Sequence, residues 1–220
     1  MKTDDYFAIG TVLTIVGILL ACAASVQTNT TVQDQTEDFE PFPDGSTVAV
    51  LPVTGGSPAA QEGISTAVDS ILRDQSEFEV LSVTSVQTTL NDSGLVEDYQ
   101  KAIRGYQETS MMNQQTLSRI LNALDADYLF QASAGQFQNQ EQTEIGAVSG
   151  NLESMENKET RVYGRVWAKN RAQPAWSAYT QSAAEETDLT YIKANQAEFY
   201  YHAAVGLTNR LFSEETEQDQ

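Results

Sequence analysis

The chain has 220 residues, 40% of them hydrophobic, which is enough for one ordinary domain with a packed core. It carries 12 Lys and Arg against 31 Asp and Glu, a net charge of −19. Such a surface repels nucleic-acid phosphates and anionic lipid headgroups, which argues against a nucleic-acid partner. The acidity either simply keeps the protein soluble or reflects a high-salt habitat.

The chain contains one Cys and one His. A single Cys excludes an intramolecular disulfide and any metal site built from clustered cysteines, and a single His excludes sites that need two. The sequence also has no GxSxG motif and few pairs of a nucleophile with a base. We therefore expect no catalytic residues, no metal site and no cofactor, so the protein is predicted not to be an enzyme.

The N-terminal segment reads as a targeting sequence. Residues 6–26 carry no charge, and residues 9–20 are strongly apolar, as in the hydrophobic region of a signal peptide. This region ends in Leu19-Leu20-Ala21-Cys22, which resembles a bacterial lipobox. The resemblance implies cleavage between Ala21 and Cys22 and attachment of diacylglycerol to the Cys22 sulfur, so that residues 1–21 are the signal peptide.

An uncleaved transmembrane anchor is the alternative, because about 20 apolar residues suffice to span a bilayer. The N-terminal region is also less positive than a signal peptide usually is, since Lys2 is offset by Asp4 and Asp5. In both cases the rest of the chain is tethered in the cell envelope. Ala23 after the cysteine favours an outer-membrane lipoprotein facing the periplasm, with inner-membrane anchoring as the alternative.

Two polar segments flank the predicted domain. Residues 22–45 are rich in Thr, Gln and acidic side chains and show no apolar period, which predicts a lipidated N-terminus and flexible tether. Residues 213–220, SEETEQDQ, predict a disordered acidic tail. A single domain is expected over residues 46–212.

The domain is predicted to open with a βαβ-like unit. Residues 48–53 form an uninterrupted apolar run, typical of a strand buried on both faces. Ser57-Pro58 is typical of a helix start, and the apolar residues from Ile64 to Leu72 fall on one helix face. Residues 78–83 predict the next strand. Helical spacing then predicts three helices around residues 86–90, 95–106 and 117–124.

The second half is predicted to be mostly strands. Residues 127–137 indicate a long strand, and the polar residues 138–158 a long hairpin loop. Residues 160–169 and 175–184 predict a C-terminal β-hairpin, and residues 195–212 a final helix with Asn195 as its cap. The fold class expected is α/β (α+β), a mixed sheet with helices packed on it.

Three local patterns carry a resemblance to a known superfamily. They are the strand STVAVLPV (46–53), the helix-to-strand step LSRILNALDADYLFQASAGQF (117–137) and the hairpin VYGRVWAKNRAQPAWSAYT (162–180). Together they resemble envelope lipoproteins of the CsgG, LpoB and TolB N-terminal-domain type. Asp125 stands where that superfamily usually has Gly. The layout of lipobox, tether and domain is most similar to LpoB-like activators of penicillin-binding proteins.

The resemblance implies a lipid-anchored, non-enzymatic binding, assembly or activator module with an envelope protein as partner. A subunit of a CsgG-like secretion complex and an envelope hydrolase are the alternatives. A pore requires membrane-spanning hairpins with alternating apolar residues, which the polar residues 138–158 lack. The oligomeric state does not follow from the sequence.

Four aromatic residues of the C-terminal hairpin are candidate partner contacts. Cross-strand packing is the simpler role for such residues, but those that face outward are available to a partner. They are Tyr163, Trp167, Trp176 and Tyr179.

Overall fold

The computed structural model describes residues 26–75, 77–145, 152–169, 171–187 and 195–213, and these form a mixed α/β fold. One seven-stranded sheet has the order β1-β7-β6-β4-β2-β3, with β5 paired to β6 outside this path. The strands are β1 (Gln27–Gln35), β2 (Thr47–Val50), β3 (Glu79–Leu81), β4 (Tyr128–Ala134), β5 (Gln138–Ile145), β6 (Leu152–Ala168) and β7 (Trp176–Thr187). The helices are α2 (Pro58–Asp74), α3 (Val83–Asp92), α4 (Val96–Thr109), α5 (Gln114–Leu124) and α6 (Gln196–Phe212).

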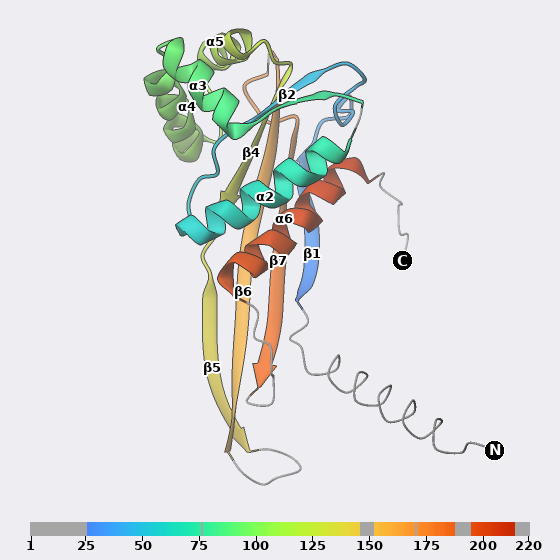
Figure 1. The fold of residues 1–220 in the computed structure, drawn as a ribbon, viewed down its shortest axis with the longest axis vertical. Helices are drawn as coiled ribbons and strands as arrows, with labels where there is room; N and C mark the ends of the chain where they lie inside the picture. Colours follow the sequence, from blue (N-terminus) through green and yellow to red (C-terminus); the bar gives the residue numbers. More distant parts are fainter. Residues whose placement is uncertain (1–25, 76, 146–151, 170, 188–194, 214–220) are drawn as a thin grey trace, which may run out of the picture.

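The predicted βαβ opening is confirmed. Strand β2 runs parallel to β3, to which it is connected through α2, and parallel to β4 on its other side. The two crossovers lie on opposite faces of the sheet (Figure 1). Val48 and Val50 of β2 belong to the core beneath α2 and α6, whereas Ala49 and Leu51 belong to the core beneath α3–α5. Both faces of β2 are therefore buried, as its uninterrupted apolar sequence predicts.

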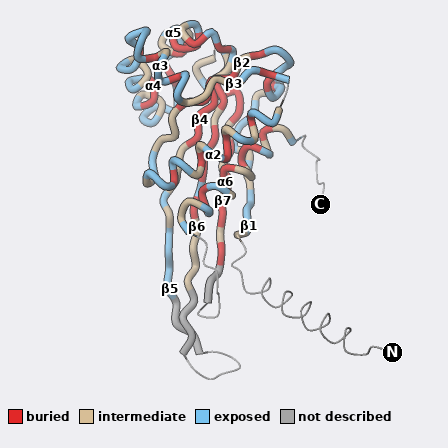
Figure 2. Tube along the Cα trace, in the orientation of Figure 1, coloured by how far each residue is buried: buried red, intermediate tan, exposed pale blue. Residues whose placement is uncertain are grey.

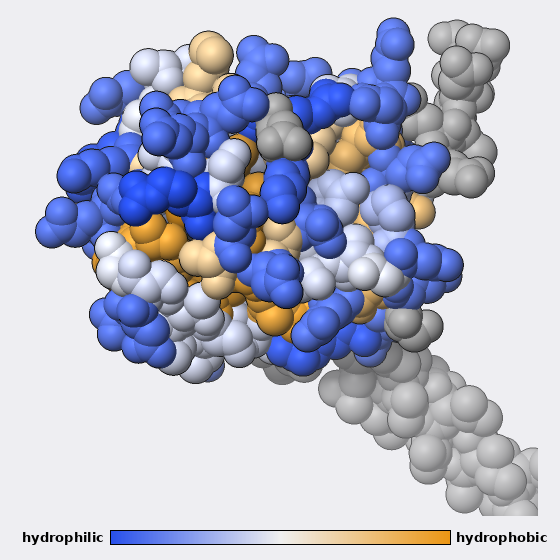
Figure 3. All heavy atoms as spheres, turned by 90° about the horizontal axis from the view of Figure 1, so that it is seen from above, coloured by the Kyte–Doolittle hydropathy of each residue, from blue (hydrophilic) through white to orange (hydrophobic). Residues whose placement is uncertain are grey.

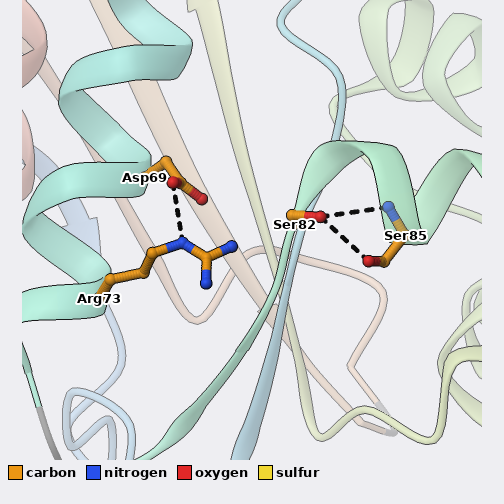
Figure 4. A network of polar contacts seen from close by, with 4 residues as sticks. All are labelled: Asp69, Arg73, Ser82 and Ser85. Carbon is orange, nitrogen blue, oxygen red and sulfur yellow. Dashed lines mark hydrogen bonds and ion pairs between the residues drawn. The ribbon is translucent and has the colours of Figure 1, made fainter.

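Helix ends follow the local capping signals. Ser57 and Asn195 are the N-caps of α2 and α6. Each side chain accepts a hydrogen bond from the backbone N–H of the residue three positions later in the chain. At the start of α3, Ser82 Oγ accepts from the backbone and shares a hydrogen bond with the hydroxyl of Ser85 (Figure 4). Each such cap satisfies a backbone N–H that the helix itself leaves free.

Asp125 ends α5 in a left-handed conformation, with φ 50°. Glycine adopts this backbone shape without cost, and Asp is one of the few other residues that tolerate it. Two residues on, the Asp127 carboxylate accepts a hydrogen bond from the Thr47 backbone N–H at 3.0 Å.

The prediction of a flexible tether over residues 22–45 is wrong for its described part. Residues 27–35 form β1, which pairs antiparallel with β7 at the edge of the sheet. Thr30 Oγ1 lies 2.6 Å from Thr180 Oγ1 across the two strands. Further along, Phe42 is 2% exposed and packs against Phe78 at 5.1 Å between ring centroids. The domain therefore begins well before residue 46.

The prediction of a loop over residues 138–158 is also wrong for its described part. Residues 138–145 form β5, and β6 starts at Leu152, so that the two strands pair as one antiparallel hairpin. Strand β6 has 17 residues and extends with β5 and β7 beyond the helices (Figure 1). Beneath the helices, buried residues of β6 alternate with less buried ones, whereas residues 138–141, at the start of β5, are exposed (Figure 2).

Some predictions concern residues outside the described part. The signal peptide, the Ala21–Cys22 cleavage site with its lipidation at Cys22, and residues 214–220 of the tail all lie there. Among the described helices, none is long and apolar enough to cross a bilayer. At the end of the molecule that carries α3–α5, hydrophilic side chains dominate the surface and hydrophobic ones show between them (Figure 3).

Candidate functional site

The four aromatic residues of the hairpin fall into two groups. Trp167 is 0% exposed in the core beneath α3–α5, and Trp176 is 1% exposed in the core beneath α2 and α6. Neither indole is available to a partner, so the prediction of a contact role is wrong for these two. Tyr163 and Tyr179 are half-buried and form a cross-strand pair with ring centroids 6.0 Å apart. They remain candidate contacts.

The face of the sheet that carries the two tyrosines is only partly covered. Side chains alternate between the faces along β6, so that Val162 and Val166 point into the α2–α6 core. On the other face, α3–α5 gather over the end formed by β2 and β4 and leave the middle of β6 and β7 without a described helix above it (Figure 1). This uncovered face is a surface on which side chains meet solvent.

Two arginines interleave with the tyrosines on this face. Arg165 stacks over the rings of Tyr106, at 5.0 Å, and Tyr163, at 5.9 Å. Arg161 stacks over Tyr179 at 5.7 Å. We call these five side chains the Arg–Tyr row. Stacking of guanidinium on aromatic rings is favourable and holds both partners in a defined orientation.

The two arginines differ in their polar partners. Arg161 lies 3.5 Å from a carboxylate oxygen of Glu159 and donates to the side-chain oxygen of Gln181 at 3.3 Å. Arg165 donates only to the Ser133 hydroxyl, at 3.4 Å, and within the described part of the chain no carboxylate lies within ion-pair distance of it. Arg165 is therefore a cation whose charge is not neutralised locally.

Arg165 lines a cleft of about 390 Å³ that lies between α4, the loop after β2 and the uncovered face of β4 and β6. We call it the Arg165 cleft. Gly55, with φ 73°, lets the loop after β2 come so close that an added Cβ would lie 2.7 Å from the Ala134 carbonyl oxygen. The lining residues are Thr54, Gly55, Ile103, Tyr106, Gln107, Ser110, Gln131, Ser133, Ala134, Tyr163 and Arg165.

The floor of the cleft contains an unsatisfied polar side chain. Gln131 is 2% exposed, and its amide nitrogen makes no hydrogen bond of good geometry within the described part of the chain. The nearby Tyr99 hydroxyl is also buried without a hydrogen bond of good geometry. Burial raises the pKa of Tyr99 to about 12, and the Gln131 amide lowers this pKa in part. A buried polar atom without a partner costs about 1–3 kcal/mol, so two such atoms side by side call for an explanation.

The topology of the sheet accounts for the location of the cleft. From the carboxyl end of β2 the chain passes through α2 on one face, whereas the helices that lead into β4 lie on the other face. Crossovers on opposite faces leave a crevice outside the carboxyl end of the strand where they diverge, and α/β proteins commonly bind ligands in such a crevice. Thr54 and Gly55 follow β2 at this point.

The lining of the cleft limits its chemistry. It contains no Asp, Glu, His or Cys, so it offers no general base paired with a nucleophile. Among the described residues, no group of three or more His, Cys, Asp or Glu is placed to hold a metal ion. What the cleft offers is a guanidinium, an amide, hydroxyls and aromatic surface, which are groups that bind and orient a ligand.

Sequence reasoning identified part of this site. It selected Tyr163 and Tyr179 but not the arginines between them, although Arg161 and Arg165 alternate with Tyr163 along one predicted strand. It also overlooked Gln131, a polar residue inside the apolar strand YLFQAS, which was the one available signal for the cleft.

Comparisons with known proteins do not assign a family. No protein-family model matches the sequence, and a search of curated proteins gives no match either. Among solved structures, the chain is similar to the PelC dodecamer from Paraburkholderia phytofirmans, with 10% identity and a TM-score of 0.42 over 87% of this chain and 100% of that one. It is also similar to the lipoprotein GNA1162 from Neisseria meningitidis, with 12% identity and a TM-score of 0.42 over 76% of this chain and 99% of that one.

These similar structures include a bacterial lipoprotein and an oligomeric protein. At such identities and TM-scores the likeness carries no argument about this chain's activity, partner or assembly. The superfamily resemblance seen in the sequence therefore stays a prediction.

Proposed function

We propose that the protein is a lipid-anchored module of the cell envelope that binds a partner through the uncovered face of its sheet and performs no catalysis. The Arg–Tyr row is the observation that carries this proposal. Arg and Tyr are enriched among the residues that dominate binding energy at interfaces, because they combine large contact area with directional polar groups. Four of the five side chains lie on β6 and β7, and Tyr106 lies on α4, so regular elements hold the row and lower the ordering cost of binding.

The lipid anchor rests on the sequence around Cys22. The Leu19-Leu20-Ala21-Cys22 segment gives the only cysteine of the chain a specific role as the thiol that accepts the lipid. In cells, Cys22→Ser is expected to abolish membrane attachment and to make processing insensitive to globomycin. If the Cys22→Ser chain stays in the membrane fraction with an unchanged mass, the segment is a transmembrane anchor and the lipoprotein assignment fails.

The binding face is tested by crosslinking and capture from intact cells. The full chain, with Tyr163→Ala and Tyr179→Ala together, is compared with the unchanged chain and with Tyr201→Ala. Tyr201 is a matched control, because it is a 38% exposed tyrosine on α6, the helix that covers the opposite face of the sheet. We expect the double variant to lose the crosslinked envelope protein and the control to keep it.

Two results would count against the proposal. Equal capture by the double variant and the unchanged chain would show that another surface makes the contact. Turnover of a substrate by the purified protein, with no partner captured, would favour an envelope hydrolase instead.

A further inference from the structure

We propose that the Arg165 cleft binds a carboxylate of an acidic, extended peptide segment, with Arg165 and Gln131 as the two anchoring side chains. This inference rests on the proposed function, because it names the chemistry of what the uncovered face would recognise. It is carried by the polar groups in the cleft, by the charge distribution of the chain and by the geometry of β6.

The cleft contains hydrogen-bond donors, on Arg165 and Gln131, for which the fold provides few acceptors. Within the described part of the chain, the Arg165 guanidinium has only the Ser133 hydroxyl as a hydrogen-bond partner. The Gln131 amide nitrogen lies near the Tyr99 hydroxyl but makes no hydrogen bond of good geometry. The guanidinium lies over the rings of Tyr106 and Tyr163, and such contacts do not use up its N–H groups, which can still donate to a ligand. An ionised carboxylate is a pure acceptor with about four lone-pair sites, and Arg binds it in a bidentate manner. A carboxylate would therefore satisfy the donors that the fold leaves unpaired.

The charge distribution supports an anionic ligand. The chain has 31 acidic residues, yet none of them lines the cleft, whose only charged side chain is Arg165. Four other described arginines lie against carboxylates, among them Arg73 with Asp69 at 2.8 Å (Figure 4). In so acidic a protein, a cation kept clear of carboxylates offers an anion a local site against an otherwise repulsive surface.

The geometry of β6 favours a peptide over a compact ligand. Arg161 and Arg165 lie four residues apart on the same face, which corresponds to about 13 Å along the strand. An extended peptide has nearly the same rise, so acidic side chains four residues apart would reach both arginines. Arg161 already shares its charge with Glu159, which makes it the weaker contact. The cleft is continuous with the open face through Tyr163, so that a chain can leave it in this direction.

The test is isothermal titration calorimetry with the full chain in detergent. The probes are end-capped hexaglutamate, end-capped hexaglutamine and tri-galacturonate, in 0.5 M NaCl to screen the net charge of −19. We expect only hexaglutamate to bind well, and Arg165→Gln to weaken its binding about tenfold or more, as the loss of a charged hydrogen-bonded pair implies. Arg73→Gln is the matched control, with the same change of charge on a helix across the sheet, and should bind as the unchanged chain does.

A second variant separates binding from folding. Gln131→Leu replaces a buried, unsatisfied amide with an apolar side chain of similar size, so that we expect Tm to rise by about 2–4 °C while hexaglutamate binding falls. A lower Tm with unchanged binding would mean that Gln131 is structural and would overturn its assigned role as an anchor.

The remaining outcomes each decide the proposal. If hexaglutamine bound as well as hexaglutamate, a carboxylate would not be what the cleft recognises. If tri-galacturonate alone bound, the ligand would be an acidic sugar and not a peptide. Either result overturns the inference. No binding of any probe also overturns it, while the captured partner of the previous section would still support the proposed function. Conversely, tight hexaglutamate binding without any captured partner would leave the cleft chemistry intact and count against the proposed function.

Discussion

Two glycines inside helices are predicted to respond in opposite ways to the same substitution. Gly63 lies in α2, where an added Cβ would meet the Ala197 carbonyl oxygen at 2.6 Å, closer than real Cβ atoms approach. This oxygen belongs to the first turn of α6, so the backbones of the two helices would have to separate. Gly105 lies in α4, where an added Cβ has nothing within 4 Å.

The expected magnitudes follow from two terms. Ala in place of Gly within a helix stabilises by up to about 1 kcal/mol, because the unfolded chain loses less backbone freedom. Overpacking costs about 1–3 kcal/mol, and a clash with a backbone atom lies at the upper end of this range. Gly63→Ala should therefore lower the free energy of unfolding by about 2 kcal/mol, while Gly105→Ala should raise it by about 1 kcal/mol.

Urea unfolding followed by circular dichroism measures both changes, and thermal unfolding provides a second readout. For a chain of this size, 1 kcal/mol corresponds to about 2–4 °C in Tm, so the two variants should differ by about 6–12 °C. If Gly63→Ala proved as stable as Gly105→Ala, α2 and α6 would not be in the close contact that the structure shows, and the argument would be refuted.

Two further predictions concern other regions of the domain. Phe42→Ala should lower the free energy of unfolding by about 3–5 kcal/mol, because the buried ring packs against Phe78, Tyr128 and Phe212. An unchanged midpoint of urea unfolding would mean that this segment is a flexible tether after all. The pKa of Tyr99 is raised to about 12, so its contribution to stability is fully present below pH 10 and is lost as the pH rises to about 12, because the unfolded state ionises first. By pH 11, one unit above the ordinary pKa of Tyr, Tyr99→Phe should remove about 1 kcal/mol of this alkaline loss. Urea midpoints that fall equally for both proteins between pH 8 and pH 11 would contradict the assignment.

The core of the fold was predictable because its strands and helices bury apolar side chains with a clear period. Strand β2 and helix α5 are examples, since Val48–Val50 and the leucines of α5 lie where their periodicity places them. Strands β1 and β5 were missed because they lack this signal. No residue of β1 is fully buried, its side toward α6 carries Thr28 and Thr30, and β5 reads QNQEQTEI. Backbone pairing holds these strands, and backbone pairing leaves little trace in composition.

The candidate site was predictable only in part for a different reason. Aromatic residues in a predicted hairpin can be recognised, but alternation alone did not show which face would lie under helices, so Trp167 and Tyr163 looked equivalent. Trp167 is buried and Tyr163 is not because α3–α5 cover only one end of this face of the sheet. The cleft requires β2, β4, β6 and α4 to meet in space, and no local pattern reports such a meeting.

Strand β1 also bears on how closely the membrane would hold this domain. A free segment over residues 22–45, which are 24 residues, could reach about 80 Å, whereas the five residues from Cys22 to Val26 can span at most about 17 Å. Gln27 pairs with Ala183, and Ala183 pairs with Glu159, next to the hairpin that projects beyond the helices. A lipid on Cys22 would thus hold that end of the sheet near the bilayer and turn α3–α5 and the Arg165 cleft outward. The Arg165 cleft would then lie at the end of the domain farthest from the membrane. Because the tether would be short, the domain could not reach far from the membrane, and a partner would have to approach it.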